Sequence, residues 1–221
     1  DVFDFELNPF PVIAIWDGGG IDTLDLSGER SRVRLDLEAG RFSDVAGLTN
    51  NLAIAYKTWI ENAIGGRGND TIVGNAFDNV LRGGFGNDEL SGEQPDFWLG
   101  YAWDDDNTPG YVLDDADELY GEGGDDTLRG GWGDDLLQGG AGTDNLDGGA
   151  GDDELNGGSG GDTLVGDAGA DEIHGGSGDD EIWGHRHEDV PEDKLNDPNW
   201  AYDDVDHLYG GDGDDTIHGG Y

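Results

Sequence analysis

Large aliphatic residues recur at every ninth position through the middle of this chain, in phase with a repeated aspartate. Residues 121–183 are seven consecutive nonapeptides of the pattern Gly-Gly-x-Gly-x-Asp-x-U-x, where U is a large aliphatic residue. The last three residues of each unit, such as Thr127-Leu128-Arg129, alternate in polarity around the aliphatic residue, which predicts a short strand with one inward face. The eighth positions are Leu128, Leu137, Leu146, Leu155, Leu164, Ile173 and Ile182.

Further copies of the unit lie on both sides of this block. Residues 65–73, 83–91 and 210–218 match the pattern, whereas residues 74–82 carry Asn79 in the Asp place. Collagen requires Gly at every third position, and a flexible linker would not keep Asp and Leu in phase over seven units. The period therefore indicates a repeated structure rather than a glycine-rich spacer.

The nonapeptide predicts a solenoid. Its first six residues form a turn, because glycine permits positive φ and lets carbonyl groups approach an ion closely. Two units then make one coil of 18 residues, with turns on opposite flanks. We therefore expect an all-β fold, a parallel β-roll: a right-handed β-solenoid with an N-terminal antiparallel strand cap and two loop inserts on one flank.

Residues 18 apart stack on one flank of such a roll, so the sixth-position aspartates form two columns. Successive carboxylates then lie about 4.7–4.9 Å apart, which is one strand spacing, and they repel one another. A cation between successive coils converts this repulsion into ligation. Carboxylate and carbonyl oxygens in a flexible cage favour Ca²⁺ over zinc or copper, and also over Mg²⁺, which demands a strict octahedron.

The candidate ligands are therefore sixth-position carboxylates and turn backbone. The uninterrupted block offers five pairs of aspartates 18 residues apart, which predicts at least five calcium ions. We expect folding to require them, because one aliphatic side chain per nine residues does not offset an ordering entropy of about 1–2 kcal/mol per residue. The carboxylates are Asp70, Asp88, Asp117, Asp126, Asp135, Asp144, Asp153, Asp162, Asp171, Asp180, Asp206 and Asp215. The backbone groups are those of Gly121, Gly123, Gly130, Gly131, Gly133, Gly139, Gly140, Gly142, Gly148, Gly149, Gly151, Gly157, Gly158, Gly160, Gly175, Gly176 and Gly178.

The charge balance narrows the range of partners. Asp and Glu total 52 against 10 Lys and Arg, a formal net charge of −42. Nucleic acids and anionic membranes need basic patches, so neither is expected as a partner. We expect no membrane span, no disulfide framework and no cleavable signal peptide. The start at Asp1 and the stop at Tyr221, two glycines into a new unit, predict that both ends are cut from a longer protein.

Residues 1–64 lack the uninterrupted repeat and hold much of the positive charge. Val33, Leu35 and Leu37 alternate with Arg34 and Asp36, which is typical of a half-buried strand. We interpret residues 1–64 as a β cap and lead-in, because a solenoid end exposes unpaired strand edges. Residues 65–221 are then the roll, interrupted at about 92–116 and 184–205.

Both interruptions are rich in aromatic and acidic residues. Each replaces the turn of one unit, and the two turns are eight units apart, so we expect them on the same flank, roughly 19 Å apart. The aromatic side chains pack back on the roll, or they bind a glycan or partner protein, or the acidic run 104–106 adds calcium sites. His185 and His187 are expected to be solvent-exposed rather than zinc ligands, because no third ligand is indicated. The other residues singled out are Phe97, Trp98, Tyr101, Trp103, Tyr111, Trp200 and Tyr202.

The nonapeptides resemble those of the repeats-in-toxin (RTX) family of secreted Gram-negative proteins. The segments VIAIWDGGG at 12–20, FSDVAGL at 42–48 and ENAIGG at 61–66 resemble the C-terminal domain of serralysin-type metalloproteases. This resemblance implies a hemolysin-type calcium-binding β-roll that supports type I secretion to the extracellular space, attached to a zinc metalloendopeptidase domain. The protease's extended His-Glu-x-x-His motif is absent from this sequence.

Three functions are therefore weighed. The first is a structural module that folds on calcium outside the cell and supports secretion and stability of an attached domain, as the resemblance implies. The second is an adhesin-type or glycan-binding module that uses the two inserts. The third is catalysis within this chain, which we do not expect, because no Ser, Cys or His constellation suggests it.

Overall fold

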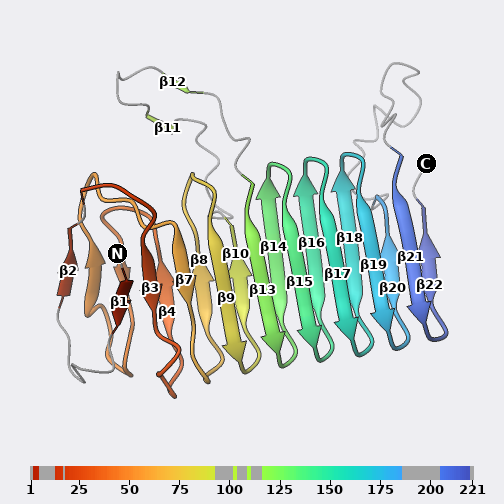
Figure 1. The fold of residues 1–221 in the computed structure, drawn as a ribbon, viewed down its shortest axis with the longest axis horizontal. Helices are drawn as coiled ribbons and strands as arrows, with labels where there is room; N and C mark the ends of the chain where they lie inside the picture. Colours follow the sequence, from red (N-terminus) through yellow and green to blue (C-terminus); the bar gives the residue numbers. More distant parts are fainter. Residues whose placement is uncertain are drawn as a thin grey trace.

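A computed structural model describes residues 2–4, 13–16, 18–92, 102–103, 109–110, 116–185 and 205–219, and within these ranges the chain forms strands and turns without a helix. Two long parallel sheets run along the molecule (Figure 1), and from Glu118 to Trp183 consecutive strands alternate between them. This is the predicted β-roll: each unit supplies one strand, and the next unit supplies a strand of the other sheet.

The two long sheets are built of the following strands, from one end of each sheet to the other. The first sheet contains β1 (Val2–Asp4), β3 (Thr23–Asp25), β7 (Asn62–Ile64), β9 (Val80–Phe85), β13 (Glu118–Gly123), β15 (Leu136–Ala141), β17 (Glu154–Ser159), β19 (Glu172–Ser177) and β21 (His207–Asp212). The second contains β22 (Thr216–His218), β20 (Glu181–Trp183), β18 (Thr163–Ala168), β16 (Asn145–Ala150), β14 (Thr127–Trp132), β10 (Glu89–Ser91), β8 (Thr71–Val73) and β4 (Arg34–Asp36). Two small sheets contain β2 (Ile13–Ile15), β6 (Leu52–Ile54) and β5 (Phe42–Ser43), and β11 (Ala102–Trp103) with β12 (Pro109–Gly110).

The strand register confirms the predicted coil of two units. Leu137 pairs with Leu155, and Leu155 pairs with Ile173, so partners are 18 residues apart. The strands of the central block are six residues long and run on through the first three positions of the following unit. Strand pairing therefore includes glycines that the sequence pattern assigns to the turn.

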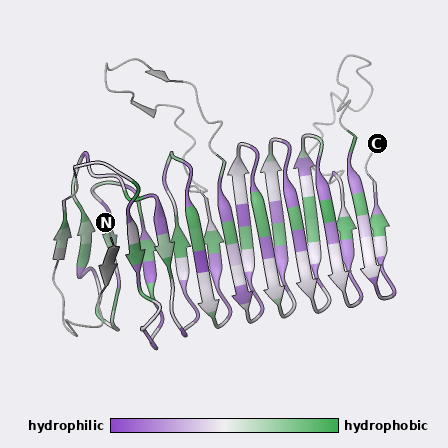
Figure 2. Ribbon diagram, in the orientation of Figure 1, coloured by the Kyte–Doolittle hydropathy of each residue, from purple (hydrophilic) through white to green (hydrophobic). Residues whose placement is uncertain are grey.

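The aliphatic positions form the core of the roll. Each eighth-position residue from Leu128 to Ile182 has an exposed fraction of 0 %, and these side chains belong to one cluster that continues back to Ile15. Figure 2 shows hydrophobic positions recurring from strand to strand along the roll. The core is one aliphatic side chain wide per strand, because the alternate positions face outward.

The N-terminal region corrects the expectation of an antiparallel cap. β1, β3 and β7 are parallel strands of the first sheet, and β4 is a parallel strand of the second. Antiparallel pairing within residues 18–92 is confined to β5 with β6 and to the bridge between Arg34 and Asp44. The physical reason is that β3 and β7 continue the backbone pairing of β9, and β4 continues that of β8. The end of the roll is therefore covered by further parallel strands.

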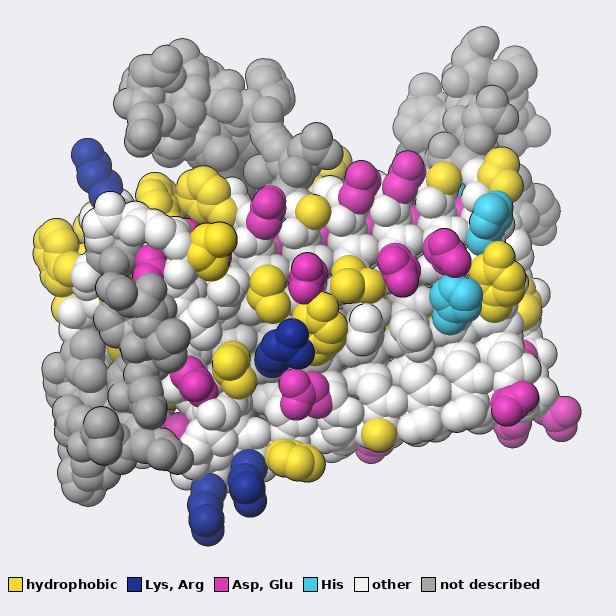
Figure 3. Space-filling view, in the orientation of Figure 1, with side chains coloured by type: hydrophobic (Ala, Val, Ile, Leu, Met, Phe, Trp, Pro, Cys, Tyr) yellow, Lys and Arg dark blue, Asp and Glu magenta, His cyan; other side chains and the backbone are white. Residues whose placement is uncertain are grey.

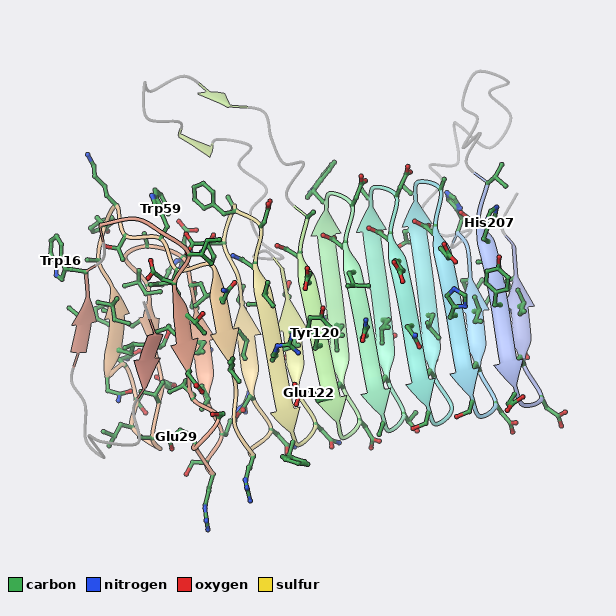
Figure 4. All side chains as sticks on the ribbon, in the orientation of Figure 1. Trp16, Glu29, Trp59, Tyr120, Glu122 and His207 are labelled. Atoms are coloured by element: carbon green, nitrogen blue, oxygen red, sulfur yellow. The ribbon has the colours of Figure 1, made fainter. Side chains whose placement is uncertain are left out.

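Side chains on the outer faces bridge the coils on either side of each insert, and we call them the junction pairs. The Arg82 guanidinium lies 4.1 Å from the ring centroid of Tyr120, and its Nη1 lies 3.7 Å from Oε1 of Glu122 (Figure 4). Across the second insert His174 stacks on Tyr209 with centroids 4.6 Å apart, and Trp183 stacks on His218 at 3.7 Å. The rings lie face to face along the roll axis, so they tie coils together rather than offering open aromatic faces outward.

Candidate metal centre

Aspartates at the sixth position form two columns joined by backbone hydrogen bonds. Flank I carries Asp70, Asp88, Asp126, Asp144, Asp162, Asp180 and Asp215, and flank II carries Asp117, Asp135, Asp153, Asp171 and Asp206. The backbone N–H of each aspartate donates to Oδ1 of the aspartate one coil further on, as from Asp126 to Asp144 at 2.8 Å. The carboxylates are thereby held in line along each flank, as the period predicted.

The second carboxylate oxygen of seven of these side chains is buried without a hydrogen-bond partner. It folds back over the first glycine of its own unit: a Cβ on Gly139 would lie 2.5 Å from Oδ2 of Asp144. A buried charged oxygen with no donor is costly unless something else compensates it. These Oδ2 atoms are those of Asp88, Asp126, Asp144, Asp153, Asp162, Asp171 and Asp180.

Carbonyl oxygens of the next coil surround the same space. A Cβ on Gly121 would lie within 2.6 Å of the Gly139 carbonyl oxygen as well as close to Oδ2 of Asp126. The arrangement repeats at Gly157, next to the Gly175 carbonyl and Asp162. Each glycine therefore leaves a small cradle lined by a carboxylate and a carbonyl oxygen, which is the donor set that a hard divalent cation prefers.

Glycine is required in these turns for a second reason. Fourth-position glycines such as Gly142 and Gly160 have φ of +148° and +136°, and a Cβ on either would overlap the carbonyl oxygen of the equivalent glycine one coil back. Second-position glycines also have positive φ, and so do the two residues that replace glycine there, Glu122 at +75° and Asp167 at +69°. Within residues 121–183 position two therefore accommodates a side chain in two units, although a Cβ on Gly140 would overlap the Glu122 carbonyl oxygen, and position four is glycine in all seven units.

Burial raises the pKa of the column carboxyl groups. The pKa of Asp153 rises to about 8, chiefly through desolvation and further through the charges of Asp171, Asp134 and Asp152, while the hydrogen bond from Asp135 opposes the shift. The same causes raise the pKa of Asp126 and Asp171 to about 7. In the absence of a counter-ion the folded roll thus disfavours the charge that these residues carry at neutral pH.

The structure brings all twelve predicted aspartates into the two columns, with differences among them. Asp70 accepts hydrogen bonds on both oxygens, from Val33 N–H and from Gly66 N–H, each at 2.7 Å. In the last described coil Asp215 is only half-buried, whereas the Asp206 side chain is 6 % exposed. No group of three or more acidic or His side chains gathers at one point within the described ranges, so backbone carbonyls would have to complete any coordination shell.

In the turn at residues 121–126 close approach of two coils falls at Gly124. Gly124 has φ of +139°, and a Cβ there would overlap the Gly86 carbonyl oxygen, whereas the predicted backbone ligands in this turn are those of Gly121 and Gly123. A Cβ added to Gly123 would meet no atom within 4 Å, and its φ is not positive. The position within the nonapeptide is a sufficient signal for Gly124, because the fourth-position glycines from Gly142 to Gly178 behave in the same way.

Both inserts join the roll on flank II, as predicted. The first reaches the column at Asp117 and the second at Asp206, and the register from Asp117 through Asp135, Asp153 and Asp171 to Asp206 spans four coils. The prediction that His185 is solvent-exposed is wrong, because its side chain is only 14 % exposed. It packs over the end of the column, where its Nδ1 lies 3.4 Å from Oδ2 of Asp206. The side chains of Phe97, Trp98, Tyr101, Trp103, Tyr111, His187, Trp200, Tyr202 and residues 104–106 lie outside the part of the structure whose side chains are described.

The exposed charges are distributed unevenly along the roll. In Figure 3 Lys and Arg side chains lie over the N-terminal half, whereas Asp and Glu side chains continue to the C-terminal end, where His side chains also lie. The central and C-terminal coils thus have few basic side chains to balance their acidic columns, which strengthens the case for bound cations. The described residues contain no helix that could cross a membrane.

Comparison with known proteins points to one family. A family model described as the C-terminal domain of serralysin, peptidase M10, matches residues 8–218. Serralysin from Proteus mirabilis is 54 % identical over 70 residues, which are 32 % of this chain and 14 % of that protein. Metallopeptidase AprA from Pseudomonas marginalis is 51 % identical over 71 residues, 32 % of this chain and 15 % of that protein. The matched stretch is thus a small part of these relatives' length.

Proposed function

This chain belongs to the peptidase M10 serralysin C-terminal family, and from this we propose that it is the calcium-binding module of a secreted metalloprotease. Calcium would lie between successive coils on both flanks. The module would fold when it meets calcium outside the cell, and its folding would support type I secretion and the stability of an attached zinc protease domain. The relatives named serralysin and metallopeptidase support the attached activity.

The observation that carries the proposal is the repeated pair of oxygens at each coil boundary. Buried Oδ2 atoms without donors, as in Asp126 and Asp162, lie next to the first glycine of their unit, and a carbonyl oxygen of the next coil lies beside the same glycine. Calcium accepts six to eight oxygen ligands in flexible geometry, so carbonyls of two neighbouring turns and their carboxylates can share one ion. The ligands would be the twelve predicted aspartates, of which Asp70 is the least favoured, together with turn carbonyls; at least five ions are proposed.

The residues of this chain would perform the switch in two ways. The carboxylates bind the cation, which removes both the repulsion along each column and the cost of their burial. The glycines keep the coils close enough for one ion to contact two turns. Since the site does not exist in the extended chain, the binding free energy becomes folding free energy.

A calcium titration tests the proposal directly. The calcium-depleted chain is expected to show a largely unordered far-ultraviolet circular dichroism spectrum, which converts cooperatively to a β spectrum at calcium concentrations on the order of 10⁻⁴–10⁻³ M. Native mass spectrometry of the folded form is expected to show at least five bound ions. A β spectrum of full amplitude in calcium-depleted buffer, or folding without ions in the mass spectrum, would be incompatible with the proposal.

The pH dependence should reverse between the calcium-free and calcium-bound chain. The folded-state pKa values of Asp144, Asp126 and Asp153 lie at about 6, 7 and 8, above the ordinary value of 3.8. Their contribution to calcium-free stability is therefore full below pH 3.8, and it is lost as pH rises through the folded-state pKa values. The calcium-depleted chain is therefore expected to gain β structure when pH falls from 8 to 5. With calcium the same fall in pH is expected to raise the calcium midpoint, because protons compete for the ligands. Circular dichroism at both pH values measures this, and equal calcium midpoints at pH 5 and 8 would contradict it.

The alternative function is a glycan-binding or adhesin-type module. It is favoured by one observation: both inserts leave the roll on flank II, four coils apart. A glycan array with the unsubstituted chain and with Trp98→Ala and Trp103→Ala would decide it. Absence of any bound glycan in calcium would eliminate this alternative without affecting the first proposal.

A further inference from the structure

One turn of the roll departs from the aspartate pattern and is closed by side-chain amides. Residues 74–79 form the first turn of flank II, and Asn79 takes the sixth position, where its N–H donates to Oδ1 of Asp117 at 2.7 Å. Asn79 is 0 % exposed and Asn75, at the second position, is 3 % exposed. Two neutral amides are therefore buried where other units place a carboxylate at position six and, in most of them, a glycine at position two.

The amide oxygen of Asn79 occupies the place of the Oδ2 atom that lacks a donor in other units. It folds back over Gly74 just as Asp88 folds back over Gly83. Here, however, the oxygen accepts a hydrogen bond from the Asn75 N–H at 2.6 Å. The position that is left unsatisfied at Asp88 and Asp126 is thus satisfied within the protein.

The amide nitrogen of Asn75 supplies a donor to the surrounding carbonyl groups. Its Nδ2 donates to the Ile60 carbonyl oxygen at 2.8 Å and lies 3.4 Å from the Leu37 carbonyl oxygen. Elsewhere in the roll, carbonyl oxygens next to the column would be satisfied by a cation. In this turn an N–H group of an uncharged side chain does so, without desolvating any charge.

The opposite turn of the same coil is also held by protein donors. Both carboxylate oxygens of Asp70 accept backbone N–H groups, from Val33 and Gly66. The pattern changes one coil later, where Oδ2 of Asp88 is buried with no hydrogen-bond partner. The boundary between the two kinds of turn therefore falls between the coil at residues 65–82 and the next one.

The apolar core is also denser on the N-terminal side of this boundary. Among the described residues, thirteen buried apolar side chains lie between Ile15 and Leu81, and ten lie between Leu90 and Ile182. The former include Leu35, Leu37, Leu52, Ile54 and Ile60, which come from outside the repeat. The cap and the first coil thus bury apolar surface that the single aliphatic side chain of a later unit cannot match.

We propose that the Asn75–Asn79 turn is a metal-free substitute for a calcium site, which lets the cap and first coil, residues 18–82, fold before calcium is bound. The calcium-dependent coils then add to this preformed template, beginning at Asp88 on flank I. This inference rests on the proposed function, because a metal-free turn has this role only if the remaining turns require the ion.

The test is hydrogen exchange of the full chain in calcium-depleted buffer, read by mass spectrometry. Amides of β7, β8 and the start of β9 are expected to exchange at least about tenfold more slowly than those of β15 to β19, and calcium is expected to protect both sets. If all strands are protected without calcium, the calcium-coupled function fails. If β7 to β9 exchange as fast as β15 to β19 and both recover with calcium, only the present inference fails.

A substituted chain gives the inference a second readout. Asn75→Gly with Asn79→Asp restores positions two and six of the repeat pattern, with Phe77 kept at position four. It is expected to remove the protection of β7 to β9 in calcium-depleted buffer while adding one calcium ion in native mass spectrometry. The control is Asn69→Asp, an exposed residue at the fifth position that keeps an oxygen to accept the Asn87 N–H and whose substitution is expected to change neither quantity. An unchanged ion count in the double variant, with protection either retained or not restored by calcium, would overturn the inference.

Discussion

Asp153→Asn is expected to destabilise the roll in saturating calcium and to stabilise it in calcium-depleted buffer. Asp153 is 2 % exposed, its Oδ1 accepts the Asp135 N–H at 2.9 Å, and its Oδ2 has no hydrogen-bond partner. Asparagine keeps an oxygen for the first bond but removes the negative charge. With calcium present the loss is expected to be about 3–5 kcal/mol, as for removing one partner of a buried charge pair.

Without calcium the same change removes an unfavourable ionisation. An acid with a folded-state pKa of about 8 opposes folding at pH 7 by roughly 4 kcal/mol relative to its ordinary value of 3.8. Urea unfolding in saturating calcium and refolding by trimethylamine N-oxide in calcium-depleted buffer measure the two effects. Asp152→Asn, at the exposed neighbouring position, is the matched control and is expected to change both by less than about 1 kcal/mol. Effects of the same sign in both buffers would show that the charge of Asp153 is not coupled to calcium.

Gly124→Ala is expected to prevent the calcium-bound coil around it from closing, whereas Gly123→Ala is expected to be harmless. Gly124 has φ of +139°, which costs an alanine about 1–3 kcal/mol, and its Cβ would overlap the Gly86 carbonyl oxygen of the preceding coil. Backbone cannot move away as a flexible side chain would. The calcium midpoint should therefore rise several-fold, and the thermal midpoint in calcium should fall.

The neighbouring glycine makes this comparison sharp. A Cβ on Gly123 would have no atom within 4 Å, and its φ is not positive. Its replacement by alanine is expected to leave stability unchanged or to raise it by up to about 1 kcal/mol through the unfolded chain. Thermal unfolding of both variants in calcium decides the matter. Equal destabilisation by the two substitutions would mean that glycine is needed for flexibility in general rather than for close approach at position four.

The period of nine predicted the fold well because it constrains three things at once. The aliphatic eighth position defines the inward face, the glycines define the turns, and the spacing of 18 residues defines which aspartates stack. The predicted pairs, such as Asp144 with Asp162, are joined in the structure by a 2.9 Å hydrogen bond. What the pattern did not contain was the direction of each oxygen, since that depends on how the carboxylate folds back over the first glycine.

The cap was predicted less well because its strands lack the repeat. The alternation of Val33, Leu35 and Leu37 correctly indicated a half-buried strand, and Arg34–Asp36 is β4. Its partner, β8, lies 37 residues further along, so no local signal specified a parallel register. The amide turn was visible as Asn79 in the Asp place, yet the role of Asn75 depends on the carbonyl groups of Ile60 and Leu37, which only the folded chain brings close.

At the junction pairs the spacing of neighbouring coils does not depend on the length of the insert between them. Register across the first gap is maintained by the parallel pairing of β9 with β13, and across the second by that of β19 with β21 and β20 with β22. The junction pairs add side-chain contacts to these strands, so the intervening peptide need not maintain the register. Closing a longer connection costs only about 0.6 kcal/mol per doubling of its length. Flank II therefore offers two places where evolution, or an engineer, can graft new sequence onto a repetitive scaffold while the ladder of coils on either side continues unbroken.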